Sequence, residues 1–429
     1  MTKKRFSGTQ NIVIILAAIA LFAFFTLINS SFASSGNLLV MTKSLVPYAI
    51  LALGVTFVIA TGGIDLSIGT VCIGSAVLAG ALCKTGVSVE EGKLWLTIPI
   101  ILVIGLLFGL LNGFLVAKCK IAPFIATLGS MLVSRGLTAV IAQVVRDGAT
   151  TAVKYPTTGW FQKVFTNLNG VPIGLVWVLV LTVICAVIMF KTKVGRYILA
   201  IGSNEEAARL SGIDVDKYKI IAYAIGGTFA GIAALFYTAA NPSLTLAAGN
   251  GMELDAIAGV YIGGTSTTGG AASILGTLLG SMILVIIRQG LNLAMASSTS
   301  VVINATNITY AVTGVIVVGA VLLDVLKKKS AAKVRVPKDP KPVSPTAILV
   351  FGILCVVFSG AVLGLVFGIL ALSLFKTYLA QGNAPCKAVT AGRALSIIGI
   401  VIAGVCLIST LVYVIFFNAA FLALFAALF

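Results

Sequence analysis

Long apolar stretches are the feature that most limits what this chain can fold into. A helix needs about 20 predominantly apolar residues to cross a bilayer, and such stretches recur as far as residue 325. They lie near residues 11–29, 44–62, 67–83, 94–117, 122–142, 172–190, 220–240, 252–266, 270–288 and 301–323. The sequence therefore predicts an all-α polytopic membrane protein with about ten transmembrane or broken helices, the eighth of them short.

The composition excludes a soluble fold and most catalytic chemistry. Hydrophobic residues make up 59% and charged residues 10% of the chain, whereas soluble domains carry roughly a quarter charged residues. The chain contains no histidine, so it lacks the most common general base and metal ligand. The seven cysteines are odd in number and show no CxxC spacing, which argues against a disulfide framework or a metal cluster. We predict no catalytic residue and no metal site.

The net charge of +17 is better explained by membrane topology than by nucleic-acid binding. Cytoplasmic loops of membrane proteins are rich in lysine and arginine, so the basic amino end is predicted to lie inside. Alternating spans then place 18 basic residues inside and 6 outside. The inside residues are Lys3, Lys4, Arg5, Lys118, Lys120, Lys191, Lys193, Arg196, Arg209, Lys217, Lys219, Lys327, Lys328, Lys329, Lys333, Arg335, Lys338 and Lys341, and the outside residues are Lys43, Lys84, Lys93, Arg146, Lys154 and Lys163.

The inward connection after the sixth span is predicted to contain a short helix. Either Ser203 or Asn204 can cap its start. Glu205 and Glu206 suit the first turn, where the helix dipole favours negative charge, and Gly212 suits the end. Because so short a helix is unstable alone in water, we expect it to pack against the membrane domain or a partner. A capped loop helix without a partner is the alternative.

The outward loop 143–171 is polar and contains Trp160 and Phe161. It could be a docking surface, an amphipathic helix at the membrane interface or a plain connector. The sequence leaves these interpretations open.

Two glycine-rich sites carry carboxylates at or inside the edge of a span. Irregular backbone at membrane depth persists only where protein or a water-filled cavity covers it, and carboxylates there are functional candidates; helix caps at the interface are the alternative. The glycine pairs 62–63 and 263–264, offset by 201 residues, are consistent with an internal duplication. Arg135 and Arg288 could each snorkel or pair with a carboxylate. The candidate pathway or broken-helix residues are Gly62, Gly63, Asp65, Ser67, Glu253, Asp255, Gly263 and Gly264.

Three strings resemble a known family. They are GSNEEAARLSGIDVDKYK, preceded by VGRYILAI, then TGGIDLSIGTV, and GMELDAIAGVYIGGTSTTGG. Together they make the chain similar to the ribose/galactose-type permeases of bacterial ABC sugar importers over about residues 10–325. The resemblance implies a permease core and a loop that inserts into a groove on an ATPase subunit. The residues implied for this coupling loop are Gly202, Asn204, Glu205, Glu206, Ala207, Ala208, Gly212 and Ile213.

The resemblance also implies which partners the chain needs. The sequence has no GxxxxGK[ST] loop, since its one Gly-Lys pair, Gly92-Lys93, is followed by leucine. We therefore expect a transport subunit and no enzyme, with no cofactor of its own and with ATP and Mg²⁺ bound by a separate ATPase. An extracytoplasmic sugar-binding protein and a second permease copy, identical or paralogous, would complete the assembly in the bacterial cytoplasmic (inner) membrane.

The sugar is not specified by the sequence. Ribose, galactose and xylose fit the resemblance, and a related permease for nucleosides is an alternative. Outside this class, an ion-coupled secondary transporter would use Asp65, Glu253 or Asp255 as its ion site, and a scaffold role would involve no flux at all.

The carboxyl-terminal part departs from the family. Residues 1–326 are predicted to form the permease domain, and residues 327–345 a basic, proline-rich cytoplasmic linker. Residues 346–429 are predicted to form an additional glycine-rich hydrophobic membrane domain with two or three segments and no assigned role. Whether the apolar run 347–375 crosses once or folds back is left open, as is the side on which Lys376, Lys387 and Arg393 lie.

Overall fold

The structure is a computed structural model that describes residues 4–84, 88–148, 152–166, 171–296, 344–357 and 362–404, with a few isolated helical residues between 311 and 319. The chain divides into two compact units. The described residues up to 296 belong to unit 1, and residues 344–404 belong to unit 2. Apart from those isolated residues, the predicted tenth span lies outside the described part of the chain, as does most of the predicted linker.

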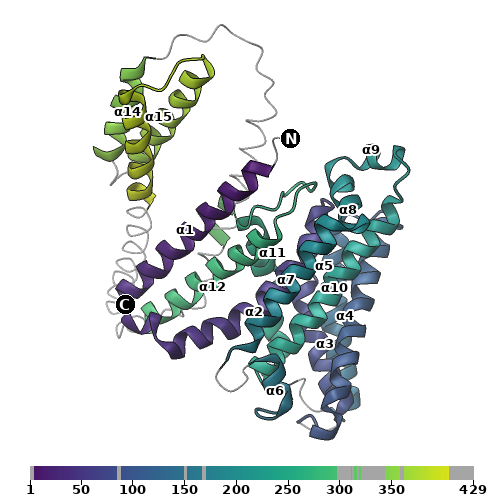
Figure 1. The fold of residues 1–429 in the computed structure, drawn as a ribbon. Coiled ribbons are helices and arrows are strands. Elements are labelled where there is room, and N and C mark those ends of the chain that lie inside the picture. Colours follow the sequence, from purple (N-terminus) through teal and green to yellow (C-terminus); the bar gives the residue numbers. More distant parts are fainter. Residues whose placement is uncertain are drawn as a thin grey trace, which may run out of the picture. The chain divides into compact units, whose positions relative to one another are not determined.

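Helices make up almost all of unit 1 in its described part (Figure 1). The helices are α1 (Lys4–Ile28), α2 (Ser35–Ala60), α3 (Ile68–Cys83), α4 (Leu94–Ala117), α5 (Pro123–Val145), α6 (Trp160–Phe165), α7 (Ile173–Lys191), α8 (Lys193–Ser203), α9 (Glu205–Leu210), α10 (Val215–Ala240), α11 (Met252–Ile262) and α12 (Ile274–Ala296). The remaining elements are the 3₁₀ turns η1 (Ser30–Ala33), η2 (Glu91–Lys93) and η3 (Leu246–Gly249), and the strands β1 (Val153–Lys154) and β2 (Ser243–Leu244).

Eight helices of the described residues are long and apolar enough to cross a membrane. This confirms the predicted all-α polytopic architecture, while α3 and α11 are shorter helices. The prediction of 270–288 for the ninth span was wrong at both ends, because α12 spans Ile274–Ala296. The Ser273 hydroxyl accepts the N–H of Gly276 and so caps the helix start, and the pairing of Arg288 described below lets the helix continue past that cation.

The core of unit 1 is formed by α2, α3 and α10. Residues 49–60 of α2 are buried all around the helix, as expected for a helix with protein on every side. Helix α4 packs on α10 through glycines, with Gly105 and Gly109 against the α10 backbone at Gly227. Small residues of this kind allow membrane helices to approach closely.

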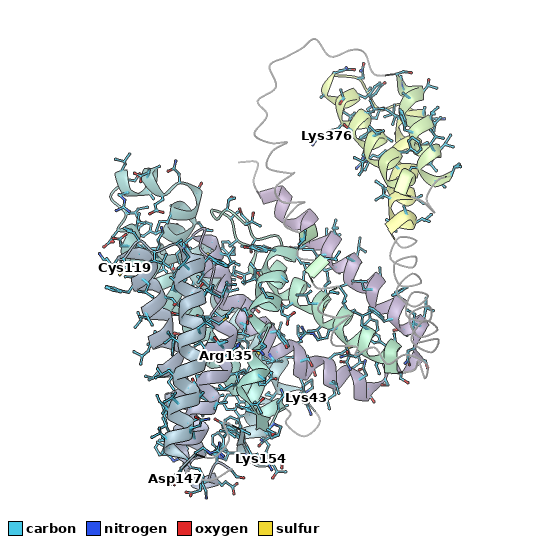
Figure 2. The ribbon with its side chains drawn as sticks, turned by 180° about the vertical axis from the view of Figure 1, so that it is seen from behind. Lys43, Cys119, Arg135, Asp147, Lys154 and Lys376 are labelled. Atoms are coloured by element: carbon cyan, nitrogen blue, oxygen red, sulfur yellow. The ribbon has the colours of Figure 1, made fainter. Side chains whose placement is uncertain are left out.

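The loops separate into two ends of the bundle. At one end β1 pairs with β2, Val153 opposite Leu244, and α6 lies there too (Figure 1). Figure 2 shows Asp147 and Lys154 at this end and Cys119 at the other, where α8 and α9 lie. Loops that the charge pattern places on one side of a membrane therefore meet at one end of the structure.

The predicted outward loop 143–171 is packed against the bundle in its described part. The Tyr155 hydroxyl donates a 2.7 Å hydrogen bond to the carbonyl of Ala76 in α3, and the Phe161 side chain is fully buried. Trp160 stays partly exposed. The described part of the loop is thus held against one end of the bundle.

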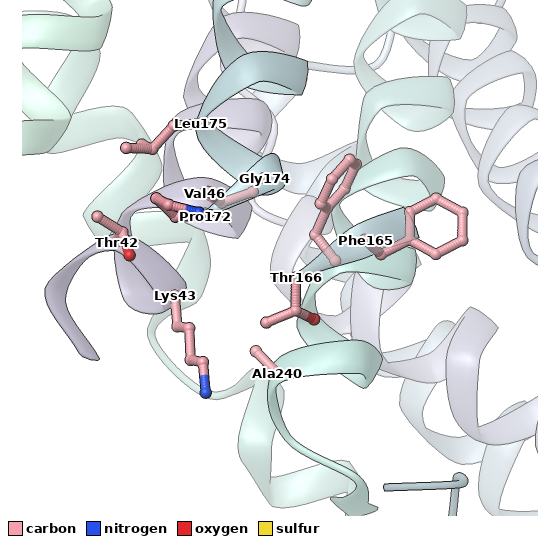
Figure 3. A pocket seen from close by; sticks show the side chains of 10 residues that line it. Thr42, Lys43, Val46, Phe165, Thr166, Pro172, Gly174, Leu175 and Ala240 are labelled. Atoms are coloured by element: carbon pink, nitrogen blue, oxygen red, sulfur yellow. The ribbon is translucent and has the colours of Figure 1, made fainter. Parts of the chain in front are cut away.

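A small hollow lies at this end (Figure 3). Lys43, which was predicted to lie in a loop, belongs to α2, and its side chain runs beside Thr166 toward Ala240. The reason is that Ser34 caps α2 by accepting the N–H of Asn37, so the helix starts before its apolar stretch. The residues lining the hollow are Thr42, Lys43, Val46, Phe165, Thr166, Pro172, Gly174, Leu175, Phe236 and Ala240.

Unit 2 contains α14 (Pro345–Val357), α15 (Val362–Ala380) and a helix over Lys387–Gly404. The run 347–375 folds back, because α14 and α15 pack side by side.

Two contacts set the directions of the three helices in unit 2. Gly352 lies against Gly392, and Cys355 against Gly399, so α14 and the third helix run in parallel. Tyr378 of α15 packs with the first turns of both. The start of α14 and the turn after α15 therefore lie at the same end of unit 2.

Candidate coupling and translocation site

Helix α9 forms where the sequence predicts it, with Asn204 and not Ser203 as its cap. The Asn204 side chain accepts the N–H of Ala207 at 3.0 Å. Glu205 occupies the first turn, as expected from the helix dipole. Gly212 follows the helix with φ +79°, a left-handed conformation that favours glycine.

A small apolar cluster holds α9 on the membrane unit. Ala208 of α9 is buried against Ile201 and Val215, with Ile213 beside them. Leu210, in contrast, is 88% exposed. The helix therefore exposes Leu210 to solvent at one end of the bundle, while the face that carries Ala208 is packed against the membrane unit.

Ion pairs connect α9 to its surroundings. Glu205 pairs with Lys219 at 2.6 Å and with Arg209 at 3.5 Å, and Asp216 pairs with Lys120 of the α4–α5 connection at 2.7 Å. Partial burial alone would raise the pKa of Glu205, but the hydrogen bond from Lys219 and the neighbouring positive charges hold that pKa below its ordinary value. The carboxylate is thus ionised at neutral pH and fixes α9 on α10.

Helix α8, which the sequence prediction missed, joins α9 to the membrane-embedded helices. Its last turn contains Gly202, where an added methyl group would collide with the carbonyl of Ala60 and lie 2.5 Å from the amide of Gly270. The N–H of Gly270 donates a 3.0 Å hydrogen bond to that same Ala60 carbonyl. The end of α8 is therefore wedged between the end of α2 and the connection from α11 to α12.

Those two segments share one local structure. After α2, Gly63 N–H donates to the Val58 carbonyl and Gly62 has φ +83°. After α11, Thr265 N–H donates to the Val260 carbonyl and Gly264 has φ +87°. Both are Schellman endings with glycine at the left-handed position.

The shared ending corrects the predicted repeat. Gly62 corresponds to Gly264, and Thr61 to Gly263, so the offset is 202 residues and not 201. The offset changes because a helix end is defined by its hydrogen bonds and its left-handed residue. Aligning the two Gly-Gly pairs in the sequence does not align these endings. Each ending leads through a break into another helix, α3 or α12.

Asp65 lies in the first break within a buried polar network. Its carboxylate accepts the N–H and the hydroxyl of Ser67, at 2.8 and 2.7 Å. The Asn112 amide of α4 donates to the Ser67 hydroxyl at 2.8 Å, and the Tyr223 hydroxyl donates to the Ile64 carbonyl at 3.1 Å. Asp65 is only 1% exposed, and its hydrogen bonds to Ser67 organise the start of α3.

The two carboxylates of α11 have different surroundings. Asp255 forms an ion pair with Arg288 of α12, and that guanidinium lies over the Tyr48 ring, 4.9 Å from its centroid. This pair is the partner assignment that the sequence left open. Glu253 instead packs on Gly69 at the start of α3, and its Oε2 atom is buried without a hydrogen-bond partner among the described residues.

The predicted site residues therefore lie in three places. The coupling segment adjoins the two breaks through Gly202, while Asp65 and Glu253 flank the start of α3 and Asp255 stands apart in its ion pair. Sequence reasoning missed Asn112 and Tyr48. Asn112 had a signal, since it is a polar residue inside an otherwise apolar span; Tyr48 had none.

A known family matches the part of the chain that contains all of these residues. Its description is "Branched-chain amino acid transport system / permease component", and the match covers residues 37–326. The chain belongs to this permease family. Together with the ribose import permeases described next, this match confirms the resemblance predicted from the three strings. The permease is a multi-pass inner-membrane protein.

Named relatives of the permease are sugar transporters. The ribose import permease protein RbsC of Haemophilus influenzae is 39% identical over 291 residues, which cover 66% of this chain and 85% of the relative. The corresponding protein of Bacillus subtilis is 36% identical over 314 residues, 71% and 89% of the two chains. The fructose import permease protein FruF of Bifidobacterium longum is 36% identical over 256 residues, 59% and 70%. No solved structure matches.

Proposed function

We propose that this permease is the membrane-spanning subunit of an ATP-driven ABC importer for a monosaccharide of the ribose, galactose or xylose type. It forms the translocation pathway by alternating access, with a second permease copy, and carries out no covalent chemistry. ATP and Mg²⁺ are bound by a separate ATPase, and an extracytoplasmic binding protein delivers the sugar. The amino end lies in the cytoplasm.

The geometry of α8 and α9 is the observation that carries this proposal. Helix α9 exposes Leu210 at one end of the bundle, where a partner can bind it. Helix α8 directly precedes α9 and ends next to Gly202. The backbone of Gly202 contacts Ala60 at the first break and Gly270 at the second. Displacement of α9 by an ATPase would therefore be passed on to the two points where the membrane helices are interrupted.

The relatives favour a sugar as the solute. Two are named for ribose import and one for fructose import. Specificity within that class is expected to come mainly from the binding protein that captures the sugar. A nucleoside permease of the same architecture remains the second candidate, and its substrates would share the ribose hydroxyl groups.

Purification of the permease from its native membrane tests the assembly. We expect a P-loop ATPase to co-purify in stoichiometric amount, together with an exported sugar-binding protein. Uptake in vesicles should require that ATPase. Recovery of the permease alone, with uptake that collapses with the ion gradient, would favour an ion-coupled secondary transporter instead.

Substitution of Leu210 tests the docking role of α9. Leu210→Asp should abolish ATPase co-purification and uptake, since an apolar side chain that is bare in the free subunit is expected to be buried by the partner. Membrane insertion should be unchanged because Leu210 is 88% exposed. Leu210→Met should retain function, and Lys163→Glu at the opposite end of the bundle should leave ATPase co-purification intact. Normal co-purification by Leu210→Asp would remove the role assigned to this helix.

A further inference from the structure

Arg135 occupies an unusual position for a cation. It lies near the middle of α5, and Figure 2 shows it midway between Cys119 at one end of the bundle and Asp147 and Lys154 at the other. Its side chain is partly exposed. A guanidinium at that depth does not face lipid, because charges inside a membrane face protein or a water-filled cavity.

The backbone next to Arg135 is irregular. The Arg135 guanidinium donates a hydrogen bond to the side chain of Asn250, which is exposed and lies between η3 and α11. Gly249 packs against Gly69 and Ile73 of α3, so this stretch reaches the depth of the first α3 turns. Non-helical backbone at such depth is tolerated only where it lines a cavity or is covered by protein.

Several buried polar atoms around the start of α3 lack partners among the described residues. They are the Arg135 Nε atom, the Glu253 Oε2 atom and the Asn112 Oδ1 atom. Arg135 is within electrostatic range of Glu253. Leaving a buried donor or acceptor unpaired is unfavourable, so atoms of this kind call for a further polar partner.

We propose that Arg135, Asn250 and Glu253 form a polar station in the translocation pathway, where the hydroxyl groups of a neutral polyhydroxylated solute are bound in passing. Arginine supplies several donors and a carboxylate only acceptors, and neighbouring hydroxyls of one solute can satisfy both. The solute assignment rests on the proposed function. Another flank of α5 is apolar, with Val133 and Val140 exposed, and we expect this flank to face lipid.

Cysteine accessibility tests the aqueous character of this face. In a background with Cys119, Cys386 and Cys406 replaced by serine, Arg135→Cys and Asn250→Cys should react in membranes with a charged, impermeant methanethiosulfonate reagent. Val133→Cys and Val140→Cys, from the flank of α5, should not. Modification of both Arg135→Cys and Asn250→Cys supports the proposed station. If both react as little as the Val133→Cys and Val140→Cys controls, the proposal is overturned.

Transport by the whole complex tests the contact with the solute. With ATPase and binding protein present and D-ribose as the probe, Arg135→Ala and Glu253→Gln should each lower the ratio of ribose transported to ATP hydrolysed at least tenfold. Arg135→Lys should recover part of it, and Val140→Ala should keep it. Wild-type ratios in both station variants would overturn the contact. A wild-type complex without ATP-dependent uptake of D-ribose, D-galactose or D-xylose would instead overturn the proposed function, whereas the accessibility result would still decide whether the face is aqueous.

Discussion

Two carboxylates on α11, only two residues apart, show how surroundings and not residue type decide a role. Asp255 has a charged partner in Arg288 and is held inside the helix bundle. Glu253 has an oxygen without a partner among the described residues and faces the start of α3. The first arrangement is typical of a structural ion pair, whereas the second leaves one oxygen of Glu253 available to the solute in the station proposed above.

Stability measurements should separate these two residues. Asp255→Asn is expected to destabilise the detergent-purified permease by about 3–5 kcal/mol, because Arg288 is left as a largely buried charge without its counter-ion. Glu253→Gln should change the unfolding midpoint little. A double variant, Asp255→Leu with Arg288→Met, should recover most of the loss. An unchanged unfolding midpoint for Asp255→Asn would show that the ion pair does not stabilise the permease.

The ionisation of Glu205 predicts a pH dependence. The pKa of Glu205 is held below its ordinary value of 4.5, so its ion pair stabilises the fold above that value and the contribution is lost as pH falls through the lowered pKa. Since the pair is partly exposed, we expect only about 0.2–1 kcal/mol. The stability difference between wild type and Glu205→Gln should be present at pH 7 and vanish in acid. A difference that grows as the pH falls would contradict the prediction.

At the scale of elements, α8 is the connection between α9 and the two helix breaks. Short helices are unstable alone, so α9 depends on its apolar anchor and its ion pairs for a fixed position. The position of α8 is also fixed, because its last turn packs tightly against the backbone of α2 and of the α11–α12 connection. Helices α8 and α9 and the two helix breaks are therefore expected to move as one body.

Gly202 is the residue on which this contact depends. Gly202→Ala places a methyl group against backbone atoms that cannot rotate away, so we expect a loss of about 1–3 kcal/mol by overpacking and a clear drop in uptake per ATP hydrolysed. Gly136→Ala is the matched control, since a methyl group there meets open space. Equal behaviour of the two variants in unfolding and uptake assays would show that α8 is not tightly coupled to the breaks.

At the scale of the whole molecule, the chain joins a permease to a second compact helical unit outside the family match. The match ends at residue 326, before the described helices of unit 2. Within unit 2, Lys376, Lys387 and Arg393 lie near the turn after α15, at the end where α14 begins. Residues 344–429 contain no acidic residue, so the basic residues alone bias the orientation of unit 2, and we expect that end to lie in the cytoplasm.

Two exposed cysteines test this orientation. Cys386 lies in the turn of unit 2, and Cys119 lies between Lys118 and Lys120 in unit 1. In variants that retain only one of them, an impermeant maleimide should label each in inside-out vesicles and neither in intact spheroplasts. Labelling of Cys386 from the outside would show that unit 2 has the opposite orientation. Labelling of Cys119 from the outside would show the same for the permease.

The sequence alone determined what depends on neighbours along the chain. Apolar stretches located the spans, as at α4, and local capping groups located α9, because hydrogen bonds at Asn204 and the left-handed Gly212 involve residues only a few positions apart. The tertiary structure decided which distant residues meet. The pairing of Asp255 with Arg288, the wedge at Gly202 and the contact of Asn112 with Ser67 depend on how helices pack, and a periodic apolar pattern does not encode which polar residue will face which. The same reason explains why the repeat was predicted at the wrong offset: only the folded helix ends define which glycines correspond.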